Sequence, residues 1–128
     1  MSSDAQAEAI KTLLATATKA PVYDHDEAQA LGGSTPTHYM IIYLSRRFGG
    51  NVRGGTRENP LRRLQTRVNA KSVTNARLIE DRLSELFEHA SHSVAGSLMH
   101  FDFETQDAAF ERDNTGYYSR LTDWTTAV

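Results

Sequence analysis

The feature that most constrains the fold is an alternation of side chains with a period of two across residues 61–71. A period of two residues is typical of a β-strand with one buried side and one solvent-facing side. The side chains expected to point into the core are Leu64, Thr66, Val68 and Ala70, and those expected to point outward are Arg63, Gln65, Arg67 and Asn69. The segment therefore predicts a half-buried strand whose outer side is polar and basic.

Two segments carry the helical period instead. Residues 3–18 repeat apolar side chains at helical spacing, and Pro21 blocks continuation of this helix. A second helix begins at Ser72 or Thr74 and reaches about residue 90. Its expected buried stripe is Ala76, Ile79, Leu83, Leu86, Phe87 and Ala90. The acids expected mostly to face water are Glu80, Asp81, Glu85 and Glu88.

Three further segments read as strands, over residues 37–45, 98–103 and 115–125. The first is apolar at consecutive positions, which predicts a strand covered on both faces. Val22 and Tyr23 read as a brief extended piece, residues 91–96 as a turn and residues 104–114 as an acidic connection. This order predicts an α+β fold: a two-layer sandwich in which a mostly antiparallel four-stranded sheet carries two helices on one face and a long basic loop.

The length of 128 residues is that of one domain, so residues 1–128 are expected to share a single core. The basic loop spans residues 46–60, contains glycine pairs at 49–50 and 54–55, and has no periodicity. Loops of this length are commonly functional or disordered.

Charge is distributed unevenly along the chain. Residues 46–67 hold seven arginines and one acid, a net charge of +6, and because the whole chain carries −2 the remainder carries −8. Such segregation indicates a surface that meets a partner of opposite sign. The arginines are Arg46, Arg47, Arg53, Arg57, Arg62, Arg63 and Arg67.

Three interpretations of this arginine segment remain open: contact with another subunit, contact with a nucleic-acid backbone, or a charged surface loop that serves solubility. Nucleic-acid binding would favour aromatic side chains interleaved with the arginines, and Phe48 is the one present. The aromatic side chains Tyr117, Tyr118 and Trp124 of the last predicted strand are either interface anchors or core residues.

Catalytic and metal-binding patterns are not apparent in the sequence. There is no cysteine, and His89 and His92 lack a third ligand at a suitable spacing. Asp24, His25 and Asp26 are adjacent residues, which rarely converge on one substrate. The glycine pairs do not match phosphate-binding spacings, and the acids of residues 102–113 do not match a calcium loop. We therefore expect no enzymatic activity, catalytic residue, metal or cofactor.

Targeting signals are likewise not apparent. The longest apolar run, residues 39–44, is too short to span a membrane, and the first residues lack a secretion signal. The sequence therefore predicts a protein of the cytoplasm, or of a particle assembled there, with no membrane partner.

The order of elements points to a family. An amphipathic N-terminal helix is followed by Val22-Tyr23-Asp24, and an apolar strand over residues 39–44 comes just after Pro36. A basic strand over residues 64–68 leads into a leucine-rich helix over 76–87, and an aromatic and glycine-containing strand over 116–124 follows. This pattern, which spans nearly the whole chain, resembles the tail-terminator (tail-completion) family of siphophages.

The resemblance implies a structural virion protein that forms a hexameric ring at the head-proximal end of the phage tail tube. The ring would end tube polymerisation and join the tail to the head. The implied partners are further copies of the chain, the major tail tube protein, a head–tail connector protein and the genome DNA that passes through the channel. The implied location is the head–tail junction of the virion, after assembly in the bacterial host cytoplasm.

Two alternatives of other kinds stay open. The chain could be another head–tail connector protein, or a small nucleic-acid-binding module that uses the arginine segment. An enzyme has only the unplaced histidines in its favour.

Overall fold

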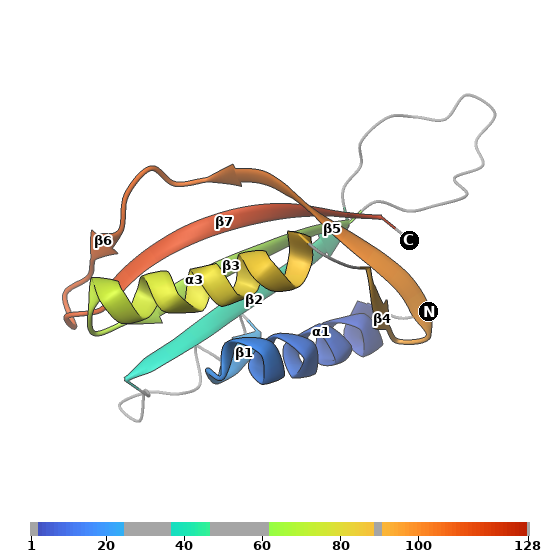
Figure 1. Ribbon diagram of the computed structural model, residues 1–128, viewed down its shortest axis with the longest axis horizontal. Coiled ribbons are helices and arrows are strands. Elements are labelled where there is room, and N and C mark those ends of the chain that lie inside the picture. The colour runs from blue at the N-terminus through green and yellow to red at the C-terminus, as the bar shows by residue number, and fades with distance from the viewer. Residues whose placement is uncertain (1–2, 25–36, 47–61, 89–90, 128) are drawn as a thin grey trace.

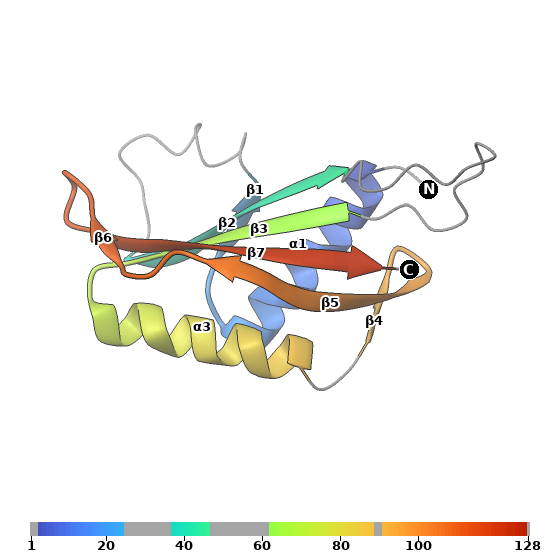
Figure 2. The same cartoon turned by 90° about the horizontal axis from the view of Figure 1, so that it is seen from above.

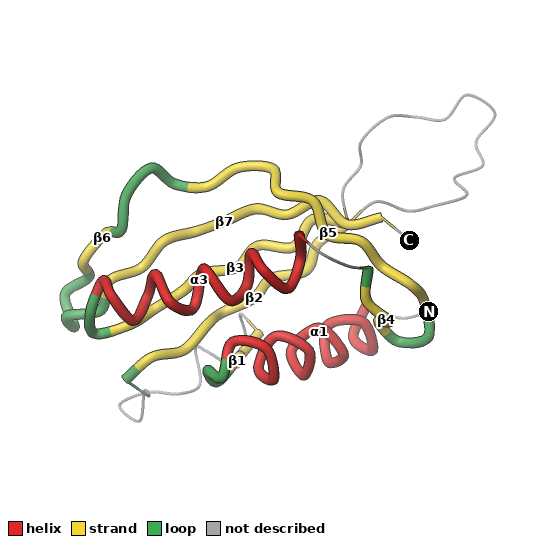
Figure 3. The backbone as a smooth tube through the Cα atoms, in the orientation of Figure 1, coloured by secondary structure: helices red, strands yellow, loops and turns green. Residues whose placement is uncertain are grey.

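The computed structural model describes residues 3–24, 37–46, 62–88 and 91–127, which form two helices and seven strands (Figures 1 and 3). The helices are α1 (Ser3–Thr18) and α3 (Val73–Glu88). The strands are β1 (Val22–Asp24), β2 (His38–Arg46), β3 (Arg62–Ala70), β4 (His92–Val94), β5 (Ser97–Gln106), β6 (Glu111–Arg112) and β7 (Tyr118–Ala127).

The strands form one mixed sheet that curls into a half-barrel (Figure 2). Its order is β1-β2-β3-β7-β5-β4, and β6 pairs with β7. β1 pairs in parallel with β2, and the other described strand pairs are antiparallel. The longest ladders join β2 to β3 and β3 to β7, so β3 lies at the centre of the sheet.

The prediction of a mostly antiparallel four-stranded sheet is wrong, because the sheet has seven strands and is mixed. The extra strands β1, β4 and β6 are two or three residues long and fall in segments read as an extended piece, a turn and an acidic connection. A strand of that length shows no detectable period, and main-chain pairing with its neighbour defines it instead.

The two helices lie where the helical period predicted them. The Ser72 side chain accepts a hydrogen bond from the Asn75 N–H at 3.2 Å, so Ser72 is the N-cap of α3. At the end of α1, Lys19 adopts a left-handed conformation with φ 57°. The carbonyl of Thr18 there accepts a hydrogen bond from Arg82 at 3.0 Å, which ties α1 to α3.

Both helices contribute to one core on the inner side of the curled sheet (Figures 1 and 2). α3 packs against β3, β5 and β7, whereas α1 packs against β1, β2, β4 and α3. The larger fully enclosed side chains are Phe87, Ile10, Leu14, Met40, Ile42, Leu64, Leu83, Met99, Val68 and Val94. The acid Glu80 is also buried, contrary to the prediction that it faces water, because Arg120 on β7 lies opposite it.

A tight turn connects β6 to β7. The Asp113 carboxylate accepts hydrogen bonds from the Thr115 hydroxyl at 2.7 Å and from the N–H groups of Thr115 and Tyr117, each at 2.9 Å. Gly116 has a φ of 88°, a conformation that glycine adopts without strain. The hydrogen bond from the Thr115 hydroxyl, together with the backbone N–H groups, lowers the pKa of the Asp113 carboxyl.

Substituting Asp113 with alanine is expected to lower the free energy of unfolding by about 1 kcal/mol, since three hydrogen bonds of the turn are lost. Because the folded-state pKa is lowered, this stabilisation is present above the ordinary pKa of an aspartic acid and is lost as the pH falls through the folded-state value. Urea unfolding across the acid range measures both effects. Asn114→Ala, at the exposed neighbouring position, is the control; an equal loss in both variants would contradict the prediction.

Candidate interaction surface

The outer face of the sheet, the side opposite the helices, presents a mixture of aromatic, apolar and arginine side chains. Strand alternation creates it, because residues between the core positions of each strand must point the other way. Figure 2 shows α3 on the other side of the strands, and α1 packs into the same core through Ile10 and Leu14. Its described members on the central strands are Tyr23 of β1, Tyr39, Ile41 and Tyr43 of β2, Arg63, Gln65 and Arg67 of β3, and Leu121 and Asp123 of β7.

A hollow of about 370 Å³ lies in the middle of the outer face. Ile41, Arg67 and Leu121 stand side by side in one cross-strand row, which forms part of the hollow. Tyr43 and Gln65 stand in the next row, and the Tyr43 side chain is 51% exposed. The residues lining the hollow are Ile41, Ile42, Tyr43, Gln65, Arg67 and Leu121.

Tyrosine rings pack together at one end of the outer face. The ring centroids of Tyr39 and Tyr23 are 6.1 Å apart, and those of Tyr39 and Tyr117 are 5.5 Å apart, both edge to face. The Lys71 Nζ atom sits 4.2 Å from the Tyr117 ring centroid. Burial, reinforced by Tyr117, raises the pKa of the Tyr39 hydroxyl. These contacts give the end of the face a fixed shape.

Two of the seven predicted contact arginines have described side chains, and they differ. Arg63 is 3.5 Å from the carboxylate of Glu104, so part of its charge is neutralised within the chain. Arg67 is exposed at the hollow and makes a long hydrogen bond of 3.5 Å to the Ser119 hydroxyl. Arg46 and Arg62 pair in register where β2 ends and β3 begins. The predicted residues Arg47, Phe48, Arg53 and Arg57 lie outside the described residues.

The predicted interface aromatics at the last strand take three different positions. Trp124 of β7 belongs to the hydrophobic core at 4% exposure, and its indole N–H donates to the Thr66 hydroxyl at 3.1 Å. Tyr117, just before β7, is 5% exposed and packs against Tyr39 at the end of the outer face. Tyr118 is half-buried beside Arg112.

Two aromatic residues of β2 that reach the outer face, Tyr39 and Tyr43, were missed. Their strand was expected to be covered on both faces because apolar residues occupy consecutive positions. The register with β3 shows which residues of β2 face outward. Tyr43 pairs with the outward Gln65, and Ile42 pairs with the inward Thr66.

Two of the described histidines, His92 and His100, make hydrogen bonds to neighbouring groups. His92 is hydrogen-bonded through Nε2 to the main-chain oxygen of Leu86 at 2.8 Å. His100 lies 3.4 Å from the Ser91 hydroxyl and 2.8 Å from the Asp102 carboxylate. All three of these side chains are exposed, so water competes for every contact.

Metal ligands do not gather in the described residues, where no group of three or more His, Cys, Asp or Glu side chains could hold an ion. The candidate ligands His25, Asp26 and His89 fall outside that part of the chain. No helix in the described ranges is long and apolar enough to cross a lipid bilayer.

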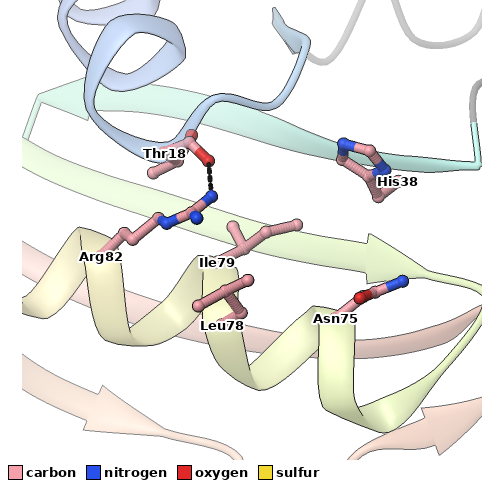
Figure 4. Close-up of a pocket in the computed structure, with 6 residues that line it drawn as sticks. All are labelled: Thr18, His38, Asn75, Leu78, Ile79 and Arg82. Carbon is pink, nitrogen blue, oxygen red and sulfur yellow. Dashed lines mark hydrogen bonds between the residues drawn. The ribbon is translucent and has the colours of Figure 1, made fainter.

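A smaller cavity of about 160 Å³ lies on the helical side (Figure 4). It is lined by Thr18, His38, Asn75, Leu78, Ile79 and Arg82. The guanidinium of Arg82 donates a hydrogen bond to the main-chain oxygen of Thr18, at the end of α1, at 3.0 Å. Arg82 therefore joins the two helices.

Comparison with known proteins adds a fold and no activity. No protein-family model matches the chain, and no curated protein is measurably similar to it. A solved structure whose name describes no function matches with a TM-score of 0.56 at 13% identity, covering 100% of this chain and 96% of that one. At that identity the likeness shows a shared fold alone.

Proposed function

We propose that this chain is a non-enzymatic structural protein that forms a hexameric ring at the head-proximal end of a phage tail tube. In this role the ring ends tube polymerisation and joins the tail to the head, in the virion. The observation that carries the proposal is the outer face, where aliphatic, tyrosine and arginine side chains gather on the side of the sheet that the helices leave uncovered. Aromatic residues and arginine are enriched in the buried centres of protein interfaces.

Further support comes from the resemblance to siphophage tail terminators and from the charge segregation along the chain. A ring joins one patch of each copy to a different patch of the next. A segment of +6 and a remainder of −8 supply opposite charges for such a contact. The partners in this proposal are further copies of the chain, the major tail tube protein, the connector protein and the DNA in the channel.

Light scattering coupled to size exclusion, followed by negative-stain imaging, tests the proposal. The expected result is a discrete ring, which stops the growth of tail tube protein when added to it. A chain that stays monomeric at every concentration, and leaves tube growth unchanged, would overturn it. A monomer that binds duplex DNA with a steep salt dependence would instead support the nucleic-acid-binding alternative, which the clustered arginines favour.

Reversing the charge at Arg62, Arg63 and Arg67 together is expected to weaken ring formation, because three cations of the basic segment become anions. The measurement is the mass of the assembly as a function of protein concentration. Replacing the same three residues with glutamine is the matched control, because it shows how much of the effect comes from loss of the positive charge and how much from its reversal. Unchanged assembly at moderate salt would rule out an electrostatic contact through this strand.

A further inference from the structure

Beyond ring formation itself, we infer that the outer face receives helix α3 of a neighbouring copy, with Leu78 in the hollow and Asp81 and Glu85 beside Arg67. This inference rests on the proposed function and names the two surfaces that would meet.

The receiving surface combines an apolar hollow with an available cation. The hollow of about 370 Å³ is large enough for an aliphatic side chain, and Ile41 and Leu121 supply apolar lining. At its edge, Arg67 is exposed and its described hydrogen bond, to the Ser119 hydroxyl, is long at 3.5 Å. The guanidinium therefore retains donors that can meet a carboxylate of a partner.

The inserting surface is the outward stripe of α3. Leu78 is one of the few large apolar side chains that are strongly exposed, at 46%. Asp81 and Glu85 follow it by three and seven residues, so all three lie on one stripe of the helix. Both acids are exposed. An apolar side chain flanked by two carboxylates matches an apolar hollow edged by an arginine.

Other charges on the two surfaces also bear on this pairing. On the outer face, Asp123 accepts a hydrogen bond from the Thr105 hydroxyl at 3.1 Å through one carboxylate oxygen, while its other oxygen has no partner among the described residues. Arg63 already faces Glu104. On α3, the exposed Arg77 lies one turn before Asp81. Arg67 thus remains the cation of the hollow that has no carboxylate partner among the described residues.

The two surfaces cannot meet within one copy. α3 packs on the inner side of the sheet, and its outward stripe and the outer face point in opposite directions (Figure 2). Joining them requires a second copy, whose own outer face then receives a third. Such a head-to-tail contact is the kind that closes a ring. The lengths also agree: a 16-residue helix is about 24 Å long, and a nine-residue strand about 30 Å.

Disulfide trapping tests the pairing sharply, because the chain contains no cysteine of its own. The double variant Leu78→Cys with Gln65→Cys places one thiol on each surface. Under mild oxidation it is expected to form a ladder of covalent multimers that ends at the size of the ring, since only close main-chain positions can be bridged. Each single variant is expected to remain uncrosslinked. A control pair, Leu78→Cys with Glu111→Cys, keeps the first thiol and moves the second to an exposed strand away from the hollow.

Exchange of charges gives an independent readout. Arg67→Glu and Glu85→Arg are each expected to raise the concentration needed for assembly by about tenfold, and the double variant is expected to restore it. A missing ladder in a protein that still forms rings, or a double variant no better than the singles, would overturn the pairing and leave ring formation standing. A wild-type chain that never assembles would overturn both. Thermal unfolding confirms that each variant is folded.

Discussion

Replacing Phe87 with alanine is expected to lower the free energy of unfolding by about 3–5 kcal/mol. The side chain is fully buried, stacks on Phe101 with ring centroids 4.2 Å apart, and packs edge to face with Trp124 with centroids 4.9 Å apart. Three elements, α3, β5 and β7, therefore meet at this ring. Its removal leaves a cavity that none of the three can fill without moving from the others.

Chemical denaturation in urea measures the effect, with the slope of the transition checked for two-state behaviour. Leu98→Ala is the matched control, because Leu98 is also a large apolar residue but is 66% exposed. We expect the control to change the free energy of unfolding by less than about 0.5 kcal/mol. If Phe87→Ala were as mild as the control, Phe87 would not hold the helix, β5 and β7 together.

Much of this core was predictable, because the elements that form it are long enough to show a period. The alternation along β3 predicted which side chains point inward, and Leu64 and Val68 are buried while Arg67 is exposed. The helical stripe of α3 likewise predicted Leu83 and Phe87 as core residues. A helix or strand of about ten residues with one consistent hydrophobic period has only one apolar side that it can bury.

The sheet beyond its four long strands was not predictable in the same way. β1 owes its place to parallel pairing of Val22 with Met40, a partner separated by a long stretch of chain. β4 turns back into β5 through Ala95 and Gly96, both with positive φ, and alanine at such a position is not the expected turn residue. Pairing of this kind depends on tertiary contacts and leaves no local signal.

The outer face was only half predictable for a related reason. The polar side of β3 identified Arg63 and Arg67 as outward, but β2 is apolar on both sides and so did not reveal that Tyr43 faces outward. The hollow exists because a strand with apolar residues on its outer side lies beside the basic one. It became visible once β2, β3 and β7 were aligned in register.

The buried ion pair between Glu80 and Arg120 was the least expected feature of the core. Glu80 lies on the side of α3 that faces β7, and its carboxylate accepts hydrogen bonds from two nitrogens of the Arg120 guanidinium. Gln106 donates to the same carboxylate at 3.4 Å, and the Phe110 ring lies 4.2 Å from the guanidinium carbon. The hydrogen bond with Glu80 raises the pKa of Arg120, so the guanidinium stays charged.

Removing one partner of this pair is expected to cost about 3–5 kcal/mol of unfolding free energy, because the remaining charge is left largely buried without its counterpart. Glu80→Ala and Arg120→Ala test this separately by urea unfolding. Glu88→Ala, an exposed acid on the same helix, is the control and should change little.

The double variant Glu80→Met with Arg120→Leu distinguishes a net stabilisation by the ion pair from the cost of leaving one charge unpaired. Replacing both charges with apolar side chains of similar volume is expected to be near neutral, since the desolvation of the pair offsets most of its attraction. If the double variant unfolded as easily as the single variants, the pair itself, and not the avoidance of an unpaired charge, would stabilise α3 on β7. If the single variants were neutral, water would have to solvate the remaining charge, although the side chains of Arg120 and Glu80 are only 18% and 10% exposed in the folded chain.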